Sequence, residues 1–104
     1  MTLFIGIDIG TSSVKAALID PEDRRVAEAS RPIPVATPRP GWSEQHPDLW
    51  RQALGSCLDR LAAEHVRPMQ AVAGIGLTGQ MLGAVLIGAD DRPLRPAILW
   101  NDQR

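Results

Sequence analysis

Two apolar runs separated by a short polar turn open the chain, and they constrain the fold more than any other feature. Leu3–Ile9 is rich in β-branched and aromatic residues, and Val14–Ile19 is a second such run after the turn Gly10–Ser13. These runs predict two strands joined as a hairpin. A second turn at Asp20–Asp23 leads into Arg25–Pro34, whose apolar residues alternate well enough for a third strand. The opening of the chain is therefore predicted to form an antiparallel meander.

The middle of the chain changes from strand signals to helix signals. Proline and glycine mark Thr37–Pro47 as a loop, which Trp42 and Trp50 are expected to anchor to the body of the domain. In Pro47–Glu64, apolar residues recur every three or four positions, which predicts an amphipathic helix with proline in its first turn. Gly55 weakens this helix by roughly 1 kcal/mol relative to alanine.

Short apolar runs return after the helix. Val72–Leu77 predicts a fourth strand, and Ala84–Ile87 predicts a further short strand after a loop. Asp90 and Asp91 indicate a turn, and the prolines beyond it keep the remaining residues extended but irregular. The order β-β-β-α-β is the start of the ribonuclease H-like fold of actin, hexokinase and the heat-shock ATPases. We therefore predict an α/β chain that forms part of this fold, with a short insertion.

Composition and charge argue against several classes of partner. The net charge is −1, and no basic run is present to neutralise a nucleic-acid backbone. The apolar runs are too short to span a membrane, and no export signal precedes the first strand, which favours the cytoplasm. Cys57 has no internal disulfide partner and is expected in the core, whereas His46 and His65 are expected at surface or capping positions. At 104 residues, the chain holds one small domain at most.

A polar cluster at the first turn carries the chemistry. Asp8 interrupts an apolar strand, and a lone carboxylate there is costly unless it is paired, hydrogen-bonded or bound to a metal such as hydrated Mg²⁺. Gly10 permits a tight turn. The next three residues, Thr11, Ser12 and Ser13, offer hydroxyl and N–H groups that suit phosphate oxygens. Lys15 would add positive charge unless its strand turns it outward. The alternative is a plain hairpin with Asp8 capping turn amides.

Four separated segments share motifs with one known family. GIDIGTSSVK (residues 6–15) resembles the first phosphate loop of the FGGY carbohydrate kinases. GWSEQHPDLW (residues 41–50) is similar to the segment before that family's first long helix, and GIGLTGQMLGAVL (residues 74–86) to a strand and loop of its xylulokinases. LRPAILWNDQR (residues 94–104) looks like the stretch that closes the sugar side of the cleft. Because the four occur in the family's order, chance is a poor explanation.

The resemblance implies a role for each matched residue. Asp8 would organise the metal and phosphates of the nucleotide. The phosphate loop would bind ATP through Gly10, Thr11, Ser12, Ser13 and Lys15. The sugar side would use Gln80, Met81, Leu82, Trp100, Asn101 and Asp102, with Arg104 adjacent. The implied reaction transfers phosphate from MgATP to D-xylulose and gives the 5-phosphate.

The sugar loop departs from the xylulokinase pattern at one position. Leu82 stands where these kinases usually place a histidine that contacts the sugar. Losing such a polar contact can cost about 1–3 kcal/mol if the partner stays buried and unpaired. The resemblance therefore leaves open another ketose or a polyol, or a neighbour that replaces the contact. Glycerol kinases carry an Arg-Glu pair that is absent after Gln80, so a pentulose is favoured over glycerol.

The resemblance also implies that residues 1–104 are the N-terminal part of the first kinase lobe. In the family, the catalytic aspartate lies far downstream, and the adenine pocket belongs to a second lobe. The isolated chain is therefore expected to be inactive, to bind nucleotide only weakly, and to self-associate through exposed lobe surface. The alternative is a free-standing nucleotide- or partner-binding module. A ribonuclease H-type nuclease is disfavoured, because Thr78-Gly79-Gln80 stands where metal-binding carboxylates would be needed.

Overall fold

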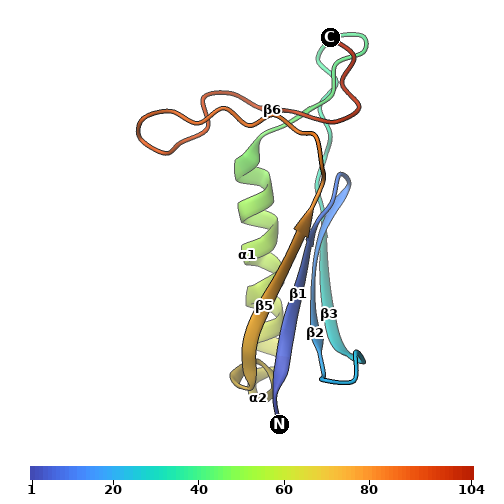
Figure 1. The fold of residues 1–104 in the computed structure, drawn as a ribbon, viewed down its shortest axis with the longest axis vertical. Helices are drawn as coiled ribbons and strands as arrows, with labels where there is room; N and C mark the ends of the chain where they lie inside the picture. Colours follow the sequence, from blue (N-terminus) through green and yellow to red (C-terminus); the bar gives the residue numbers. More distant parts are fainter.

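The computed structural model describes all of residues 1–104 as one elongated body of 49 × 28 × 21 Å. A sheet of long strands runs along its length, and one helix lies against a single face of that sheet (Figure 1). At one end, beyond the strands, the chain forms a loop of residues 83–96 that projects sideways, and we call this loop the arm. The molecule is therefore a half-covered sheet with an irregular cap.

The main sheet has four strands in the order β3-β2-β1-β5. Its members are β1 (Leu3–Ile9), β2 (Ser13–Ile19), β3 (Arg25–Pro32) and β5 (Val72–Gly79). The first three form the predicted antiparallel meander, and β5 adds to β1 in parallel. The third strand ends two residues before the predicted Pro34, whose ring nitrogen has no hydrogen to donate to a ladder.

The long helix α1 (Pro47–Glu64) has the bounds that its apolar periodicity predicts. His46 caps its start, because the Nδ1 atom of the imidazole accepts a hydrogen bond from the Asp48 N–H at 3.2 Å. A short helix α2 (Val66–Gln70), which the sequence did not reveal, then turns the chain back toward β5. Pro68 reads as a helix breaker, yet here it lies in the first turn, where a missing N–H leaves no bond unmade.

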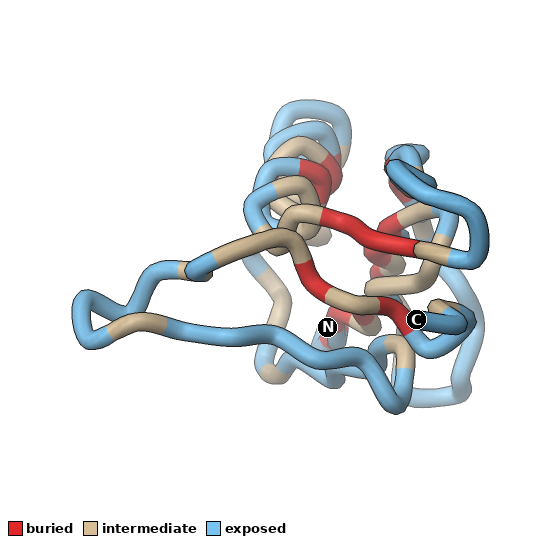
Figure 2. The backbone as a smooth tube through the Cα atoms, turned by 90° about the horizontal axis from the view of Figure 1, so that it is seen from above, coloured by how far each residue is buried: buried red, intermediate tan, exposed pale blue.

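The core lies between α1 and the sheet. Cys57 and Leu61 of the helix pack in one buried cluster with the strand residues Ile5, Ile7, Ala16, Leu18 and Ala29, and Ala53 packs in a second with Val14 and Ile33. Cys57 is therefore a core residue, as expected, and burial raises the pKa of its thiol. In Figure 2 the buried residues follow the helix, the sheet and part of the chain above them, whereas the arm is mostly exposed.

The predicted strand at Ala84–Ile87 does not form. Its ends make only single bridges, Ala84 with Ile98 and Ile87 with Pro93, because nearby glycines and prolines interrupt any ladder. The turn that the two aspartates indicate is present, with Arg92 N–H donating to Asp90 and Asp91 in a left-handed conformation.

A small two-stranded sheet forms instead from segments that read as irregular. It pairs β4 (Glu44–Gln45), inside the proline-rich loop, with β6 (Ala97–Ile98). This pairing ties the C-terminal residues to the start of α1. No helix is both long and apolar enough to cross a membrane.

Candidate functional site

The predicted phosphate loop (residues 10–13) and the predicted sugar loop (residues 80–82) lie side by side because β1 and β5 are parallel. Ile9 is level with Gly79, so the residues after each strand leave the sheet at the same edge. The Gln80 backbone N–H donates to the carbonyl of Ile9 at 3.1 Å, and its side-chain Nε2 donates to the carbonyl of Gly10 at 3.3 Å. The topology therefore brings together two segments that are about seventy residues apart in the sequence.

The turn after β1 is tight. The Gly10 N–H donates to the carbonyl of Ser13 at 2.9 Å, and a Cβ atom on Gly10 would lie 3.1 Å from that same oxygen. The backbone N–H groups of Thr11 and Ser12 make no hydrogen bond within the chain. Successive free N–H groups in a turn are the donors that a phosphate nest requires.

The hydroxyl of Thr11 is engaged by two distant segments. It donates to Gln80 Oε1 at 3.2 Å and accepts from the indole N–H of Trp100 at 3.1 Å. A hydroxyl has one hydrogen, and here that hydrogen points to Gln80. In this arrangement, Thr11 offers a ligand its backbone N–H rather than its side-chain O–H.

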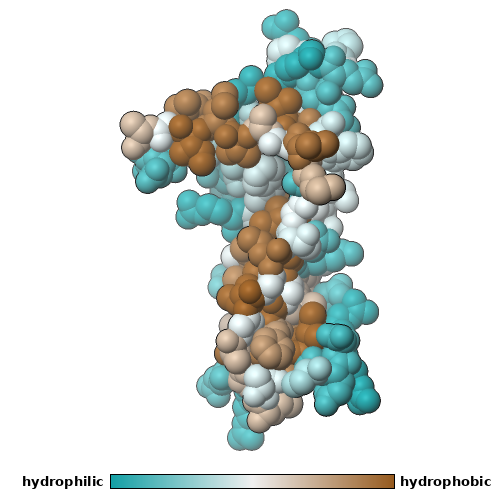
Figure 3. Space-filling view, in the orientation of Figure 1, coloured by the Kyte–Doolittle hydropathy of each residue, from teal (hydrophilic) through white to brown (hydrophobic).

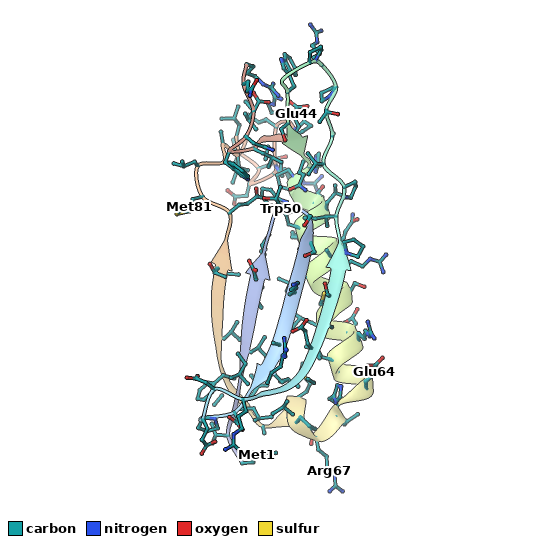
Figure 4. All side chains as sticks on the ribbon, turned by 90° about the vertical axis from the view of Figure 1, so that its right-hand side faces the viewer. Met1, Glu44, Trp50, Glu64, Arg67 and Met81 are labelled. Atoms are coloured by element: carbon teal, nitrogen blue, oxygen red, sulfur yellow. The ribbon has the colours of Figure 1, made fainter.

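Gln45 lies beneath these contacts, and sequence reasoning did not single it out. Its side-chain Nε2 donates to the carbonyls of Thr11 (2.6 Å) and Pro34 (3.3 Å). Its Oε1 accepts from the Trp50 indole N–H (2.9 Å) and from Gln80 Nε2 (3.2 Å). No sequence pattern distinguishes Gln45 from its neighbours in the matched segment. Its side chain is buried because it lies in β4. Figure 4 shows the labelled Trp50 near this end of the sheet.

Asp8 lies on the sheet face that α1 does not cover. It pairs with Lys15 on β2 and with Thr78 on β5, and all three side chains are exposed. Asp8 is therefore not the buried charge that its apolar strand suggested, because α1 packs on the opposite face. Lys15 also points outward on that open face. The three residues line a shallow depression of about 430 Å³, which also contains Glu28.

The residues near Asp8 fit a metal ion that is carried by a nucleotide. The Asp8 carboxylate accepts no hydrogen bond from the chain, and no cluster of three potential metal ligands exists. Mg²⁺ is commonly held by one or two carboxylates together with water and substrate phosphates. One free carboxylate beside a turn with free N–H groups suits that mode of binding.

The sugar loop faces solvent. The side chains of Met81 and Leu82 are 79% and 90% exposed, and Met81 projects away from the sheet in Figure 4. Leu82 adopts a positive φ of 61°, a left-handed conformation that a branched aliphatic residue rarely takes. A cleft of about 370 Å³ lies next to this loop. Its lining includes Ile9, Trp50, Thr78, Gln80, Gly83 and Leu99.

The C-terminal residues divide between this region and a separate ion-pair cluster. Trp100 reaches Thr11, whereas Asn101 is exposed and lines a different, open cavity of about 560 Å³ beside Trp42. The carboxylate of Asp102 is 2% exposed and accepts from Arg104 Nη2 and from the Ser43 N–H, each at 2.7 Å. These bonds, the one from Arg104 first, hold the pKa of Asp102 well below its usual range.

Glu44 extends the same cluster. Its carboxylate pairs with Arg95 and, at 2.8 Å, with Arg104. The guanidinium of Arg104 also stacks 3.6 Å from the centre of the Trp42 ring, which anchors the proline-rich loop as expected. In the structure, Asp102 and Arg104 therefore bind the C-terminal segment to β4, and a contact between either residue and a sugar stays a prediction.

Comparison with known proteins gives consistent relatives. The chain is 45% identical to the xylulose kinase of Escherichia coli over 102 residues, which are 98% of this chain and 21% of the relative. Its fold superposes on a xyloylose kinase from Brucella ovis with a TM-score of 0.95 at 49% identity, covering 98% of this chain and 22% of that one. It also superposes on a xylulose kinase from Rhodospirillum rubrum with a TM-score of 0.93 at 36% identity, covering 98% of this chain and 21% of that one.

The chain thus spans about a fifth of the length of the relatives that it matches. Residues 3–104 match the description "FGGY family of carbohydrate kinases, N-terminal domain". The order of the elements, the two adjoining loops and this match agree with one another. The chain belongs to the FGGY family of carbohydrate kinases.

Proposed function

We propose that this chain is the N-terminal part of an ATP-dependent kinase that phosphorylates the terminal hydroxyl of D-xylulose. One observation carries the proposal. The phosphate loop and the sugar loop, each identified by its motif, are joined by direct hydrogen bonds from Gln80 to Gly10 and from Thr11 to Gln80. Phosphoryl transfer depends on holding the phosphate donor and the acceptor hydroxyl in one geometry, and joined loops serve that requirement.

The proposed roles follow from the hydrogen-bond donors and charges that have no partner within the chain. The N–H groups of Thr11 and Ser12 donate to phosphate oxygens, and Gly10 and Ser13 shape the turn that presents them. Asp8 holds Mg²⁺ that arrives with ATP, and the bound ion neutralises negative charge on the phosphates. Lys15, level with Asp8 across the sheet, adds positive charge to the same face.

The sugar is bound beside the sugar loop. Met81, Leu82 and Trp100 border that region, and Gln80 holds the loop in place through its three side-chain hydrogen bonds. Leu82 offers no hydrogen bond to a sugar hydroxyl, so the contact that a histidine would make must come from elsewhere in the site. Asp102 helps to hold the segment after Trp100 next to β4, and Asn101 lines a separate cavity, so a contact between either residue and the sugar stays a prediction.

The isolated chain is proposed to bind nucleotide weakly and to turn over nothing. The open depression near Asp8 has no walls on its outer side, so water is not excluded from it. Glu28, the other carboxylate in this depression, is paired with Arg25. The competing proposal, a nucleotide-binding module without kinase activity, rests on the same free N–H groups.

ADP release by the complete gene product, measured with a panel of sugars, tests the proposal. The panel contains D-xylulose, other ketopentoses, polyols and glycerol, and the 104-residue chain serves as the control. Release that depends on D-xylulose, and that only the complete product catalyses, supports the kinase. ADP binding without any sugar-dependent release would favour the binding module.

A further inference from the structure

We propose that Gln45 is a positioning residue that sets the geometry of the phosphate loop and the sugar loop together. The inference rests on the proposed kinase function, because it assigns the residue a role in that site. Gln45 is 1% exposed and makes hydrogen bonds to both loops and to the first turn of α1. No other side chain in the molecule bonds to all three.

The amide of Gln45 is used completely. A glutamine side chain offers two N–H donors and two acceptor lone pairs, and this one has two partners for each. Burial of an amide is unfavourable unless it is hydrogen-bonded, so a position needed only for packing is better served by an apolar residue. The full set of bonds indicates that the polar group itself is required.

The direction of every hydrogen bond in this network is fixed from its ends. Trp50 and Trp100 can only donate through their indole N–H groups. Trp50 therefore points at Gln45 Oε1, which leaves the Gln45 Nε2 for the carbonyl of Thr11. Gln80 must then present Nε2 to Gln45 and Oε1 to Thr11, and Trp100 completes the chain at the Thr11 hydroxyl.

One consequence concerns Thr11. With its carbonyl held by Gln45 and its hydroxyl hydrogen held by Gln80, the orientation of its peptide is set from two sides. That orientation aims the free N–H groups of the turn. Gln45 therefore acts on phosphate binding through Thr11 and on sugar binding through Gln80, without touching either ligand.

The kinetic test is a double-mutant cycle in the complete gene product. Gln45→Met keeps the side-chain length and removes the amide, and it is expected to lower kcat/KM about tenfold, with a higher KM for both substrates. Gln80→Met is expected to lower it similarly, and adding Gln45→Met to Gln80→Met is expected to cost less than a further twofold. Gln52→Met on the exposed side of α1 is the matched control and should leave kcat/KM unchanged.

Two outcomes separate the possible failures. An active wild type in which the two losses multiply would overturn the positioning role alone, since a purely structural residue lowers the folded fraction equally in either background. A wild type that phosphorylates no sugar would overturn the proposed function and the positioning role together. If Gln45→Met does not fold, Gln45→Asn replaces it in the cycle, because the shorter amide cannot reach all four partners.

A spectroscopic readout follows the network without any substrate. The indole ¹⁵N–¹H resonances of Trp42, Trp50 and Trp100 report three separate places. Gln45→Met should shift those of Trp50, which it touches, and of Trp100, which it reaches only through Gln80 and Thr11. The Trp42 resonance should stay in place, because that ring contacts Arg104 instead. A Trp100 resonance that does not move would contradict the coupling.

Discussion

Leu82 combines a strained backbone with an almost fully exposed side chain. Its φ of 61° is unfavourable for a residue with a Cβ atom by roughly 1–2 kcal/mol, and its side chain recovers little of that through packing. Strain of this kind is commonly retained at binding sites, where the conformation serves the ligand. Leu82 therefore reads as a residue kept for what the loop does.

Leu82→Gly should raise the free energy of unfolding by about 0.5–1 kcal/mol, because glycine adopts a positive φ without the Cβ penalty. Urea denaturation measures the change. Leu86→Gly is the control, since Leu86 is also exposed but has a negative φ, and glycine there should give no gain. A stability gain at both positions would show that the backbone strain is not the cause.

Asp102 gives the chain a specific acid sensitivity. Its bonds with Arg104 and Ser43 lower its folded-state pKa below the unfolded value of about 3.9. The stabilisation is therefore complete above the unfolded value and is lost progressively as the pH falls from that value toward the lower folded-state pKa. The free energy of unfolding of Asp102→Asn should change less between about pH 5 and pH 3 than that of the wild type. Asp59→Asn, an exposed carboxylate on α1, is the control and should follow the wild-type curve.

For individual residues, the sequence predicts which ones belong to the site but not which hydrogen bonds they make. The motifs predict Thr11 in the phosphate loop and Gln80 and Trp100 on the sugar side, and the structure places Thr11 in hydrogen-bond contact with both. Gln45 stayed hidden because inward orientation of a glutamine depends on β4, a two-residue strand without a periodic signal. Asp8 is exposed because burial of a strand face depends on which elements cover it.

Among the elements, α1 is the one that local chemistry specifies most fully. Its capping residue His46 directly precedes its eighteen residues, its proline is the first of them, and its apolar stripe runs through them, so the sequence predicts both ends. The two short strands β4 and β6 are held by pairing across some fifty residues and by the ion pairs of Glu44. Such long-range contacts leave no local pattern, so the sequence predicts a strand at Ala84–Ile87 but neither β4 nor β6.

Gly55 is a weak point in α1 that can be repaired. A Cβ atom at this position would meet nothing within 4 Å, so Gly55→Ala should raise the free energy of unfolding by about 1 kcal/mol. Gly41→Ala makes the same chemical change where φ is +77°, and it should lower the free energy of unfolding instead. Thermal and urea denaturation of both variants measure these changes. Destabilisation by Gly55→Ala would mean that the added methyl group clashes with a neighbour, contrary to the open space around Gly55 in this structure.

At the scale of the whole molecule, the sheet is covered unevenly. In β5, Ile75 and Leu77 lie level with Ile5 and Ile7, the strand residues that α1 buries, yet they are 65% and 69% exposed because α1 packs over β2 and β3. Figure 3 shows this apolar surface together with that of the arm. The two edges also differ, since β3 carries charged residues and a proline, whereas β5 carries none.

This asymmetry predicts that the 104-residue chain self-associates through β5. Sedimentation velocity should show a mass-average that rises with concentration, because exposed apolar patches and an uncharged edge strand both favour association. Ile75→Thr with Leu77→Thr keeps β propensity while removing apolar area, and it should restore a monomer at concentrations where the wild type associates. Val26→Thr makes the same type of change on the charged edge strand and should leave association unchanged. A wild type that stays monomeric at high concentration would instead mean that the exposed side chains of Ile75 and Leu77 do not drive association of the isolated chain.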